Sequence, residues 1–312
     1  MSNSKEMNSE EKWRKINILE NTDIVENENN IKNRAMINLK LQFKKNKFAL
    51  VSLVILIIII VSSLLAFLSP YDPNKINLSE KFLSPNLNHF FGTDELGRDY
   101  FTRVLYGGRV SLTVGFASMF VSVIIGTLVG VISGYVGGIV DSINMRIIDV
   151  FMCIPTFFLI LIANAYLGSS IINIIVIIGI FGWMGTARIV RSETLSFKER
   201  EYVMASKSLG ASNKHIIKKH IIPNLISSII VISSISIAGA ILSESALSFL
   251  GLGVQEPMAS WGSMLQKAQE NILDIPYLSL FPGIIILLTV LSFNILGDVL
   301  RVALDPKVND EG

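Results

Sequence analysis

The chain has 312 residues, of which 51% are hydrophobic and 17% are charged, and its formal net charge is +2. Apolar residues at this level, gathered in long blocks, exclude an ordinary soluble domain, and the near-neutral charge argues against nucleic acid as a partner. The single cysteine, Cys153, excludes an intramolecular disulfide. The composition therefore predicts a protein embedded in a lipid bilayer.

The first predicted element is the apolar run 48–68, which follows a polar segment. Residues 1–37 are rich in Asn, Glu and Lys, so we expect a disordered cytoplasmic tail there. The run has 21 residues without a charge, and about 32 Å of helix crosses a hydrocarbon core of about 30 Å. A cleaved signal peptide is the alternative, but the run is longer than a signal-peptide h-region and 47 residues precede it. We therefore predict a first transmembrane helix.

Five more apolar runs complete the predicted spans, at 110–133, 147–167, 171–189, 224–249 and 281–302. Pro155 lies in the third run and predicts a kink, or a helix that starts after Ile154. The predicted fold is all-α and integral to the membrane, with six transmembrane helices. We divide the chain into the tail 1–37, a first transmembrane helix with an external loop at 38–109, a transmembrane domain at 110–307 and a C-terminal tail at 308–312.

Positive residues determine the predicted orientation, because Lys and Arg near the ends of spans favour the cytoplasmic side. Six precede the first span, namely Lys32, Arg34, Lys40, Lys44, Lys45 and Lys47. Eight more lie in the segment 188–224, namely Arg188, Arg191, Lys198, Arg200, Lys207, Lys214, Lys218 and Lys219. We expect both termini and this segment in the cytoplasm, and external loops at 69–109 and 251–280.

Glycine recurs at every fourth position of the second span, at Gly126, Gly130 and Gly134. Such a stripe lets another helix backbone approach closely. The helix that packs there lies either within this chain or in a second subunit.

The segment between the fourth and fifth spans predicts a helix, a turn and a helix. Residues 201–210 are typical of a short helix ended by glycine, and 212–222 of a second helix stopped by Pro223. A basic cytoplasmic segment of this kind offers a soluble partner a surface to bind.

The fifth span is the most polar of the six, so it is a candidate border of a translocation pathway. Its polar residues include Glu244, Ser236 and Ser243, and a charge inside a membrane costs several kcal/mol unless it is paired or wet. A water-lined cavity explains these residues together. Two alternatives stay open: Glu244 snorkels to the external interface while the serines bond to their own backbone, or Glu244 forms a buried pair with a cation.

Motifs of catalytic chemistry are absent from the sequence, which has no phosphate-binding P-loop, no H-E-x-x-H and no paired-cysteine metal site. His215 and His220 are five residues apart, which on an α-helix places them about 140° from each other and spoils a shared metal site. We predict no catalytic residue, no metal and no cofactor bound by this chain, which is therefore not an enzyme.

Residues 201–212, EYVMASKSLGAS, followed by HIIPN at 220–224, resemble the EAA loop of bacterial ABC importer permeases. Met204 and Ser206 stand where that loop has Glu and Ala. In the family the loop, here 191–223, docks its short helix onto an ATPase. The resemblance implies ATPase-coupling roles for Glu201, Tyr202, Ala205, Ser206, Leu209, Gly210, Ala211 and Pro223.

Two further segments are similar to the C-type permeases of oligopeptide, dipeptide and nickel importers. They are 91–103 running on to 108–112, and 244–253 followed by 260–263. The charged residues of the first segment could equally form a solvated surface network without a transport role. The resemblance implies the type I ABC importer permease fold with a cytoplasmic coupling helix, in the inner or plasma membrane of a bacterium.

The same resemblance implies import of short peptides by alternating access. Its partners would be a second, B-type permease subunit, two ATP-binding subunits and an external solute-binding protein, with ATP and Mg²⁺ bound at the ATPases. Nickel or another small solute is the alternative cargo, and a passive channel or a scaffold is the alternative class.

Overall fold

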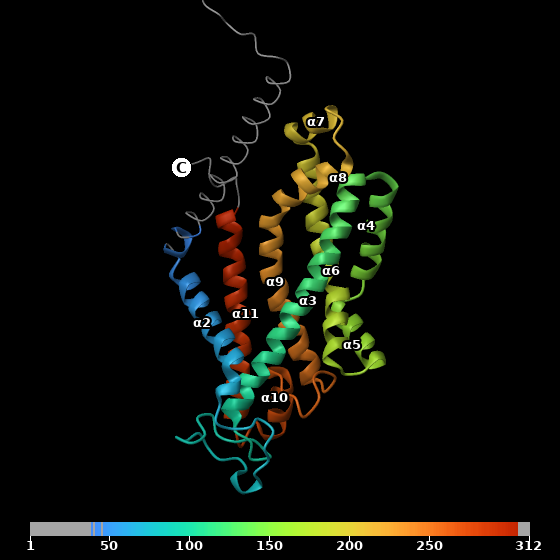
Figure 1. Cartoon of the computed structure of the whole chain (residues 1–312). Helices are drawn as coiled ribbons and strands as arrows, with labels where there is room; N and C mark the ends of the chain where they lie inside the picture. The colour runs from blue at the N-terminus through green and yellow to red at the C-terminus, as the bar shows by residue number, and fades with distance from the viewer. Residues whose placement is uncertain (1–38, 40, 45, 305–312) are drawn as a thin grey trace, which may run out of the picture.

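Long apolar helices lie side by side in an elongated bundle, and short helices cover its two ends (Figure 1). The computed structural model describes residues 39, 41–44 and 46–304. The predicted tails 1–37 and 308–312 lie outside the described residues. Within the described part, the β structure is limited to an isolated bridge between Thr93 and Asp99. The predicted all-α fold is confirmed.

The helices follow one another along the chain with short connections, apart from the long loop between α2 and α3. Their bounds are α2 Lys47–Leu64 with the 3-10 turn η1 Leu65–Leu68, the 3-10 turn η2 Leu78–Glu80, α3 Tyr100–Val136, α4 Gly138–Met152, α5 Thr156–Leu167, α6 Ile171–Lys198, α7 Glu201–Ser208, α8 Asn213–Ile216, the π-helical turn η3 Ile217–Ile221, α9 Ile222–Phe249, α10 Trp261–Ala268 with the 3-10 turn η4 Gln269–Asn271, and α11 Tyr277–Leu304.

Five stretches of the described residues are long and apolar enough to cross a membrane, namely Lys47–Leu68, Tyr100–Val136, Ile171–Lys198, Asn213–Phe249 and Tyr277–Leu304. The sixth predicted span is broken, because α4 and α5 meet at an angle of 81°. The predicted break in the third span at Pro155 is therefore confirmed: α5 starts after it, at Thr156. Pro155 precedes α5 with φ −55°; its missing N–H and its ring prevent the helix from running through.

Two spans extend well past their apolar runs. The helix α3 starts at Tyr100, because the side chain of Asp99 accepts the Thr102 backbone N–H at 2.8 Å and caps it. At its other end α6 continues to Lys198. Hydropathy marks only the part of a helix that lies in lipid, whereas caps determine where the helix begins and ends.

The glycine stripe of α3 packs within this chain, which decides between the two partners left open above. The largest helix–helix interface joins α3 and α6. A Cβ atom at Gly126, Gly130 or Gly134 would lie 2.8, 2.7 or 2.8 Å from a backbone carbonyl oxygen of α6. Because these three positions of α3 lack a side chain, the two helices can touch along the stripe.

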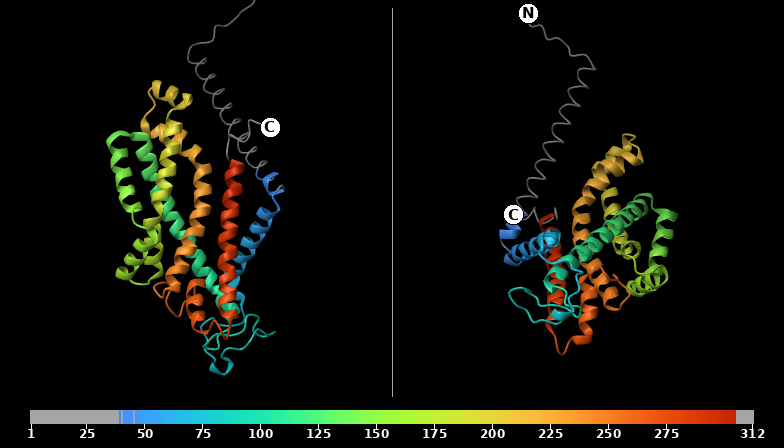
Figure 2. Two further views of the ribbon diagram at one scale, coloured as in Figure 1. Left: turned by 180° about the vertical axis from the view of Figure 1, so that it is seen from behind. Right: turned by 60° about the horizontal axis from the view of Figure 1, so that its bottom comes forward.

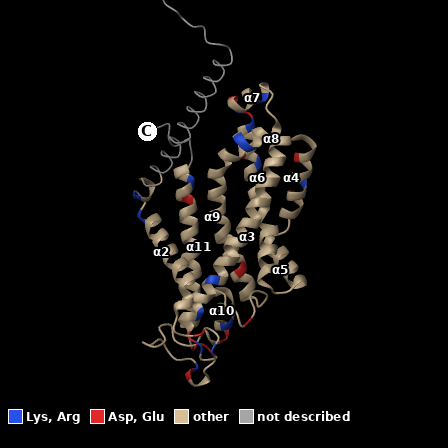
Figure 3. Ribbon diagram, in the orientation of Figure 1, with Lys and Arg blue, Asp and Glu red and all other residues tan. Residues whose placement is uncertain are grey.

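The other long helices surround this pair. Figure 2 shows α2 and α11 side by side, and α9 lies between α11 and α3, with contacts to both. Figure 3 shows charged residues gathered towards the two ends of the bundle and few along its middle. The helices α7 and α8 lie at one end of the bundle, the α7 end. The helix α10 and the loop 69–99 lie at the other, the α10 end.

The predicted helix stop at Pro223 is wrong. After α8 the chain passes through the π-helical turn Ile217–Ile221 and continues directly as α9. Pro223 lies at the second position of α9, where a missing N–H is tolerated, since the first turn of a helix has no internal acceptor for it. Asn224 Nδ2 donates to the His220 carbonyl at 2.5 Å, which supplies a partner for that oxygen.

Candidate functional site

A glycine turn joins α7 to α8. Gly210 has φ +86°, a left-handed conformation that glycine adopts without strain. The Gly210 N–H donates to the Lys207 carbonyl at 3.0 Å, and the Ala211 N–H donates to the Ser206 carbonyl at 3.1 Å. These two bonds define a Schellman motif at the end of α7. Ser212 then caps α8 by accepting the His215 N–H at 3.3 Å.

One face of α7 is anchored and the other is free. Val203 is 2% exposed and packs in an apolar cluster that includes Val190 of α6, Ile216 at the end of α8 and Leu225 near the start of α9. The opposite face is exposed and carries most of the predicted coupling residues, namely Glu201, Tyr202, Ala205, Leu209 and Gly210, with Ser206 and Ala211 half-buried beside them. Pro223 is exposed but lies apart from them, within α9.

Polar contacts connect this end to α3, α6 and α4, and α9 continues from it directly along the chain. The Tyr135 hydroxyl at the end of α3 donates to Asn213 Oδ1 of α8 at 2.9 Å, and Lys198 Nζ of α6 donates to the Tyr135 carbonyl at 2.7 Å. Arg191 of α6 forms a two-pronged ion pair with Asp141 of α4. A displacement of α7 and α8 would therefore be passed to α3, α4, α6 and α9 together.

The π-helical turn corrects the prediction for the two histidines. Because a π-helix has more residues per turn, positions five apart face the same side. The rings of His215 and His220 lie 6.0 Å apart between centroids, and the Tyr202 ring lies 5.9 Å from that of His220. The described residues include no cluster of three or more side chains fit to hold a metal ion.

At the opposite end, Glu244 of α9 is fully buried with 0% exposure. Its carboxylate accepts hydrogen bonds from Ser111 Oγ of α3 at 2.9 Å and from Ser248 Oγ at 2.7 Å. No salt bridge among the described residues includes Glu244. Snorkelling to an interface is therefore wrong for this side chain, and so is a buried pair with a described cation.

The serines predicted beside Glu244 do not join it. Ser236 and Ser243 are half-buried, and Ser243 Oγ donates to the Gly239 carbonyl of its own helix at 2.8 Å. The residues that do surround Glu244 come from the two segments whose sequence resembles C-type permeases. Ser111, Ser248, Ser260 and Trp261 lie within these segments, and no signal in a single sequence indicates that the segments meet.

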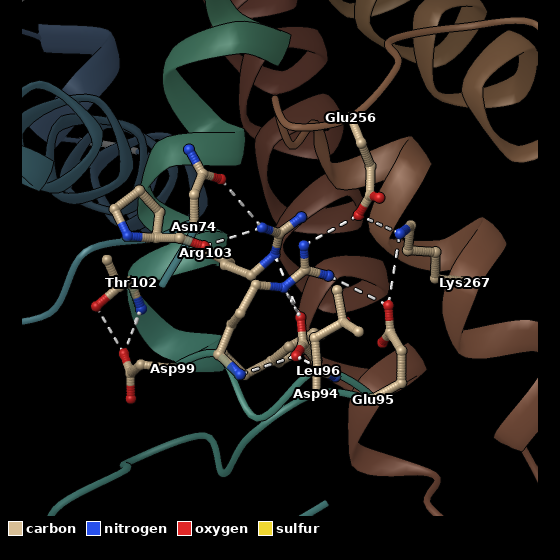
Figure 4. Close-up of polar contacts among 12 residues, drawn as sticks. Asn74, Asp94, Glu95, Leu96, Asp99, Thr102, Arg103, Glu256 and Lys267 are labelled. Atoms are coloured by element: carbon tan, nitrogen blue, oxygen red, sulfur yellow. Dashed lines mark hydrogen bonds and ion pairs between the residues drawn. The ribbon is translucent and has the colours of Figure 1, made fainter. Parts of the chain in front are cut away.

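A second cluster at the α10 end consists of six charged side chains, drawn in Figure 4: Asp94, Glu95, Arg98, Arg103, Glu256 and Lys267. Arg98 is at its centre, with Nε 2.6 Å from Asp94, Nη1 3.0 Å from Glu256 and Nη2 3.2 Å from Glu95. Asp94, Arg98 and Arg103 are buried. The alternative of a solvated surface network is therefore wrong for the centre of this cluster, which joins the loop before α3 to the loop before α10.

Only the rim of this cluster is open to solvent. Glu256 is about half exposed and pairs with Lys267 and Arg98. The Lys267 ammonium, followed by the Arg98 guanidinium, lowers the pKa of the Glu256 carboxyl to about 2. The pair therefore stays ionised over the whole ordinary pH range.

Comparison with known proteins places this arrangement in a class. A solved structure described as inward-facing conformations of the MetNI methionine ABC transporter matches with a TM-score of 0.52 and 17% identity, over 64% of this chain and 96% of that chain. At this identity the likeness concerns the fold, which is that of a type I ABC importer permease.

Sequence relatives identify the family. The family described as binding-protein-dependent transport system inner membrane component matches residues 126–310, and the N-terminal TM domain of oligopeptide transport permease C matches residues 40–85. The chain is 45% identical to the dipeptide transport system permease protein of Bacillus subtilis (strain 168), covering 86% of this chain and 84% of that one. It is 41% identical to the glutathione transport system permease protein of Escherichia coli (strain UTI89 / UPEC), covering 86% and 89%. The chain belongs to the family of inner membrane components of binding-protein-dependent transport systems.

Proposed function

We propose that this chain is the permease subunit of an ATP-driven importer that moves short peptides into the cytoplasm by alternating access. The observation that carries the proposal is the exposed face of α7, anchored through Val203 and closed by the Gly210 turn. The names of the relatives, which transport dipeptides, oligopeptides and glutathione, support a peptide as cargo.

In this proposal the end with α7 and α8 faces the cytoplasm, and the end with α10 faces outward, with both termini cytoplasmic. Eight cations between positions 188 and 224 support that orientation. Two ATPases would hold ATP and Mg²⁺, one of them docked on the free face of α7, a second permease would complete the pathway, and an external solute-binding protein would deliver the peptide. Glu201, Tyr202, Ala205, Ser206, Leu209, Gly210 and Ala211 are the proposed coupling residues, with Pro223 in the helix that follows.

Alternating access would use the fifth span as one wall of the pathway. Ser236 and Ser243 of α9 are half-buried, so they would face a pathway that opens beside the helix. Glu244 is covered in the present conformation and would reach the pathway only when the segments around it move apart.

Purification and uptake test this function directly. The tagged chain is purified gently from its native membrane, its companions are identified, and the whole assembly is reconstituted into vesicles. We expect a labelled dipeptide to accumulate with ATP and not with ADP, after addition of the co-purified binding protein. Accumulation of radioactive nickel instead would replace the cargo, and uptake without nucleotide would replace the class.

A further inference from the structure

The segment that joins α9 to α10 is hydrogen-bonded to α5, to the connection that follows α5, and to α3. Its Leu252 carbonyl accepts hydrogen bonds from the Asn164 side chain of α5 and from Ser169 Oγ, the latter at 3.1 Å. Trp261 is 1% exposed and donates its Nε1–H to the Val104 carbonyl of α3 at 3.0 Å. The segment 251–261 therefore ties the α10 ends of α3, α5 and α9 to one another.

Two glycines seat this region directly on α9. A Cβ atom at Gly253 would lie 1.9 Å from Ser248 Oγ, and one at Gly262 would lie 2.5 Å from Ser245 Cα. Neither position has room for a side chain. Close contact of this kind leaves no space for water between the segment and the helix.

The directions of the hydrogen bonds around Glu244 follow from the backbone donors. The Trp261 N–H donates to Ser111 Oγ at 3.2 Å, and the Val254 N–H donates to Ser248 Oγ at 3.1 Å. A backbone N–H can only donate, so each hydroxyl keeps its own hydrogen for another acceptor. Both hydroxyl hydrogens reach Glu244. A carboxylate, which accepts at both oxygens and donates nothing, completes this arrangement.

We infer that Glu244 is a positioning residue that pins the segment 251–261 across α3 and α9 and so holds the outer end of the permease closed. This inference rests on the proposed function, since it takes the α10 end to be external. The helices α3 and α9 can separate there only if the segment leaves one of them. Ser111 and Ser248 accept the two backbone N–H groups of the segment, and both hydroxyls donate to Glu244. The carboxylate therefore supports both contacts.

Substitution by glutamine shows why the carboxylate itself is needed. An amide has one acceptor oxygen and one NH₂ donor. If the NH₂ faces Ser248, that hydroxyl receives hydrogens from the amide and from the Val254 N–H, and its own hydrogen loses its acceptor. If the NH₂ faces Ser111, the same conflict arises with the Trp261 N–H. Either orientation leaves a buried donor unpaired, so the segment should detach more often.

Thiol labelling of the complete transporter measures this detachment. Cys153 is replaced by serine, and a single cysteine is introduced at Val254, which is 5% exposed. We expect slow alkylation in the otherwise wild-type protein, and labelling about tenfold faster after Glu244→Gln, the factor expected for the loss of a charge-assisted hydrogen bond. Ser111→Ala removes one of the two donors and leaves the carboxylate, and it should also accelerate labelling. It provides the test if the glutamine variant fails to assemble.

Two controls distinguish detachment of the segment 251–261 from a general loss of structure. A cysteine at Leu225, which is fully buried at the α7 end, reports loss of structure elsewhere, and its labelling should stay slow in both variants. Ser233→Ala removes a hydroxyl that bonds only to the Ile229 carbonyl of its own helix, at 2.7 Å, and should leave labelling at position 254 unchanged. Equal acceleration at positions 254 and 225, or unaltered labelling at 254 after Glu244→Gln, overturns the inference.

A final arm links the pin to transport. ATP, binding protein and peptide together should raise labelling at position 254 in the protein that keeps Glu244, because each transport cycle opens the outer end. Labelling that does not respond to turnover contradicts the gating role. If the protein that keeps Glu244 labels as expected but takes up no peptide, the proposed function is contradicted and the inference about Glu244 is not. Failure of one is therefore distinguishable from failure of the other.

Discussion

A single glycine sets the angle between α7 and α8. Gly210 has φ +86°, and a Cβ atom there would meet no atom within 4 Å, so only backbone strain, and not a clash, opposes a side chain there. Gly210→Val should cost about 1 kcal/mol or more in the left-handed conformation. We expect weaker binding of the ATPases to the permease and slower ATP-dependent uptake, measured by co-purification and by transport into vesicles.

Gly210→Asn is the matched control, because asparagine visits the left-handed region more readily than other non-glycine residues. It should retain most of the uptake that the valine variant loses. Assembly and uptake at the wild-type level in Gly210→Val would remove the coupling role assigned to this turn.

The ion pairs of Glu256 should stabilise the protein at neutral pH and lose that effect only in acid. Lys267 and Arg98 lower the pKa of Glu256 from 4.5 to about 2, so the folded protein holds this proton less tightly than the unfolded chain. The resulting stability is complete above the ordinary carboxyl pKa and is lost as pH falls towards the folded pKa. It is modest because the side chain is about half exposed.

Thermal unfolding in detergent tests this pH dependence. Wild-type protein should exceed Glu256→Gln in Tm by a constant small margin above the ordinary carboxyl range, and the margin should shrink as pH is lowered from 4.5 towards 2. A margin that grows in that direction would mean that the pair is not what stabilises the loop.

Among the helices, contact between α3 and α6 depends on positions that lack a side chain. Gly130→Ala would place a Cβ 2.7 Å from the Ala187 carbonyl, and overpacking of this kind costs about 1–3 kcal/mol. Gly185→Ala on α6 is the control, because no atom lies within 4 Å of its Cβ position. We expect a lower Tm for the first variant and an unchanged or higher one for the second. Equal Tm values for both would show that α3 and α6 are not in close contact.

Sequence patterns predicted the helices better than their breaks and junctions. Apolar runs indicated the spans, because the lipid interior requires apolar side chains, and Pro155 indicated the break between α4 and α5. The π-helical turn at Ile217–Ile221 was not predictable, since its residues favour an α-helix equally well; Ile216 and Ile221, at its two ends, are both buried in the bundle. That turn reversed two expectations, the stop at Pro223 and the separation of His215 from His220.

The Glu244 cluster shows the same limit at the level of a site. Glu244 was identified by its charge inside an apolar run, which is a local signal. Its bond to Ser111 spans 133 positions and depends on how α3 crosses α9. Hydropathy does not encode that crossing, so the sequence did not indicate Ser111, and from α9 itself it indicated Ser236 and Ser243 and not Ser248, which bonds to Glu244.

On the scale of the whole molecule, the two ends differ in how firmly they are held. At the α10 end, the buried Arg98 cluster and the hydrogen bonds of Glu244 both join segments far apart in the sequence, and we infer that they hold this end closed. The α7 end carries an exposed face and a basic surface. A molecule closed at one end and able to bind a partner at the other is suited to alternate between two openings when that partner moves.

Orientation of the bundle is tested by thiol labelling of intact cells. In a Cys153→Ser background, single cysteines are placed at Ser79 and Leu273, which are exposed at the α10 end, and at Ser212, which is exposed at the α7 end. Because positive residues hold the α7 end inside, a membrane-impermeant reagent should label positions 79 and 273 at once and position 212 only after the membrane is opened. The reverse pattern would invert the molecule and place the free face of α7 beyond the reach of any cytoplasmic ATPase. Labelling of all three positions from outside would contradict an odd number of crossings between residues 79 and 212 and, with it, the assignment of α4 and α5 as one broken span.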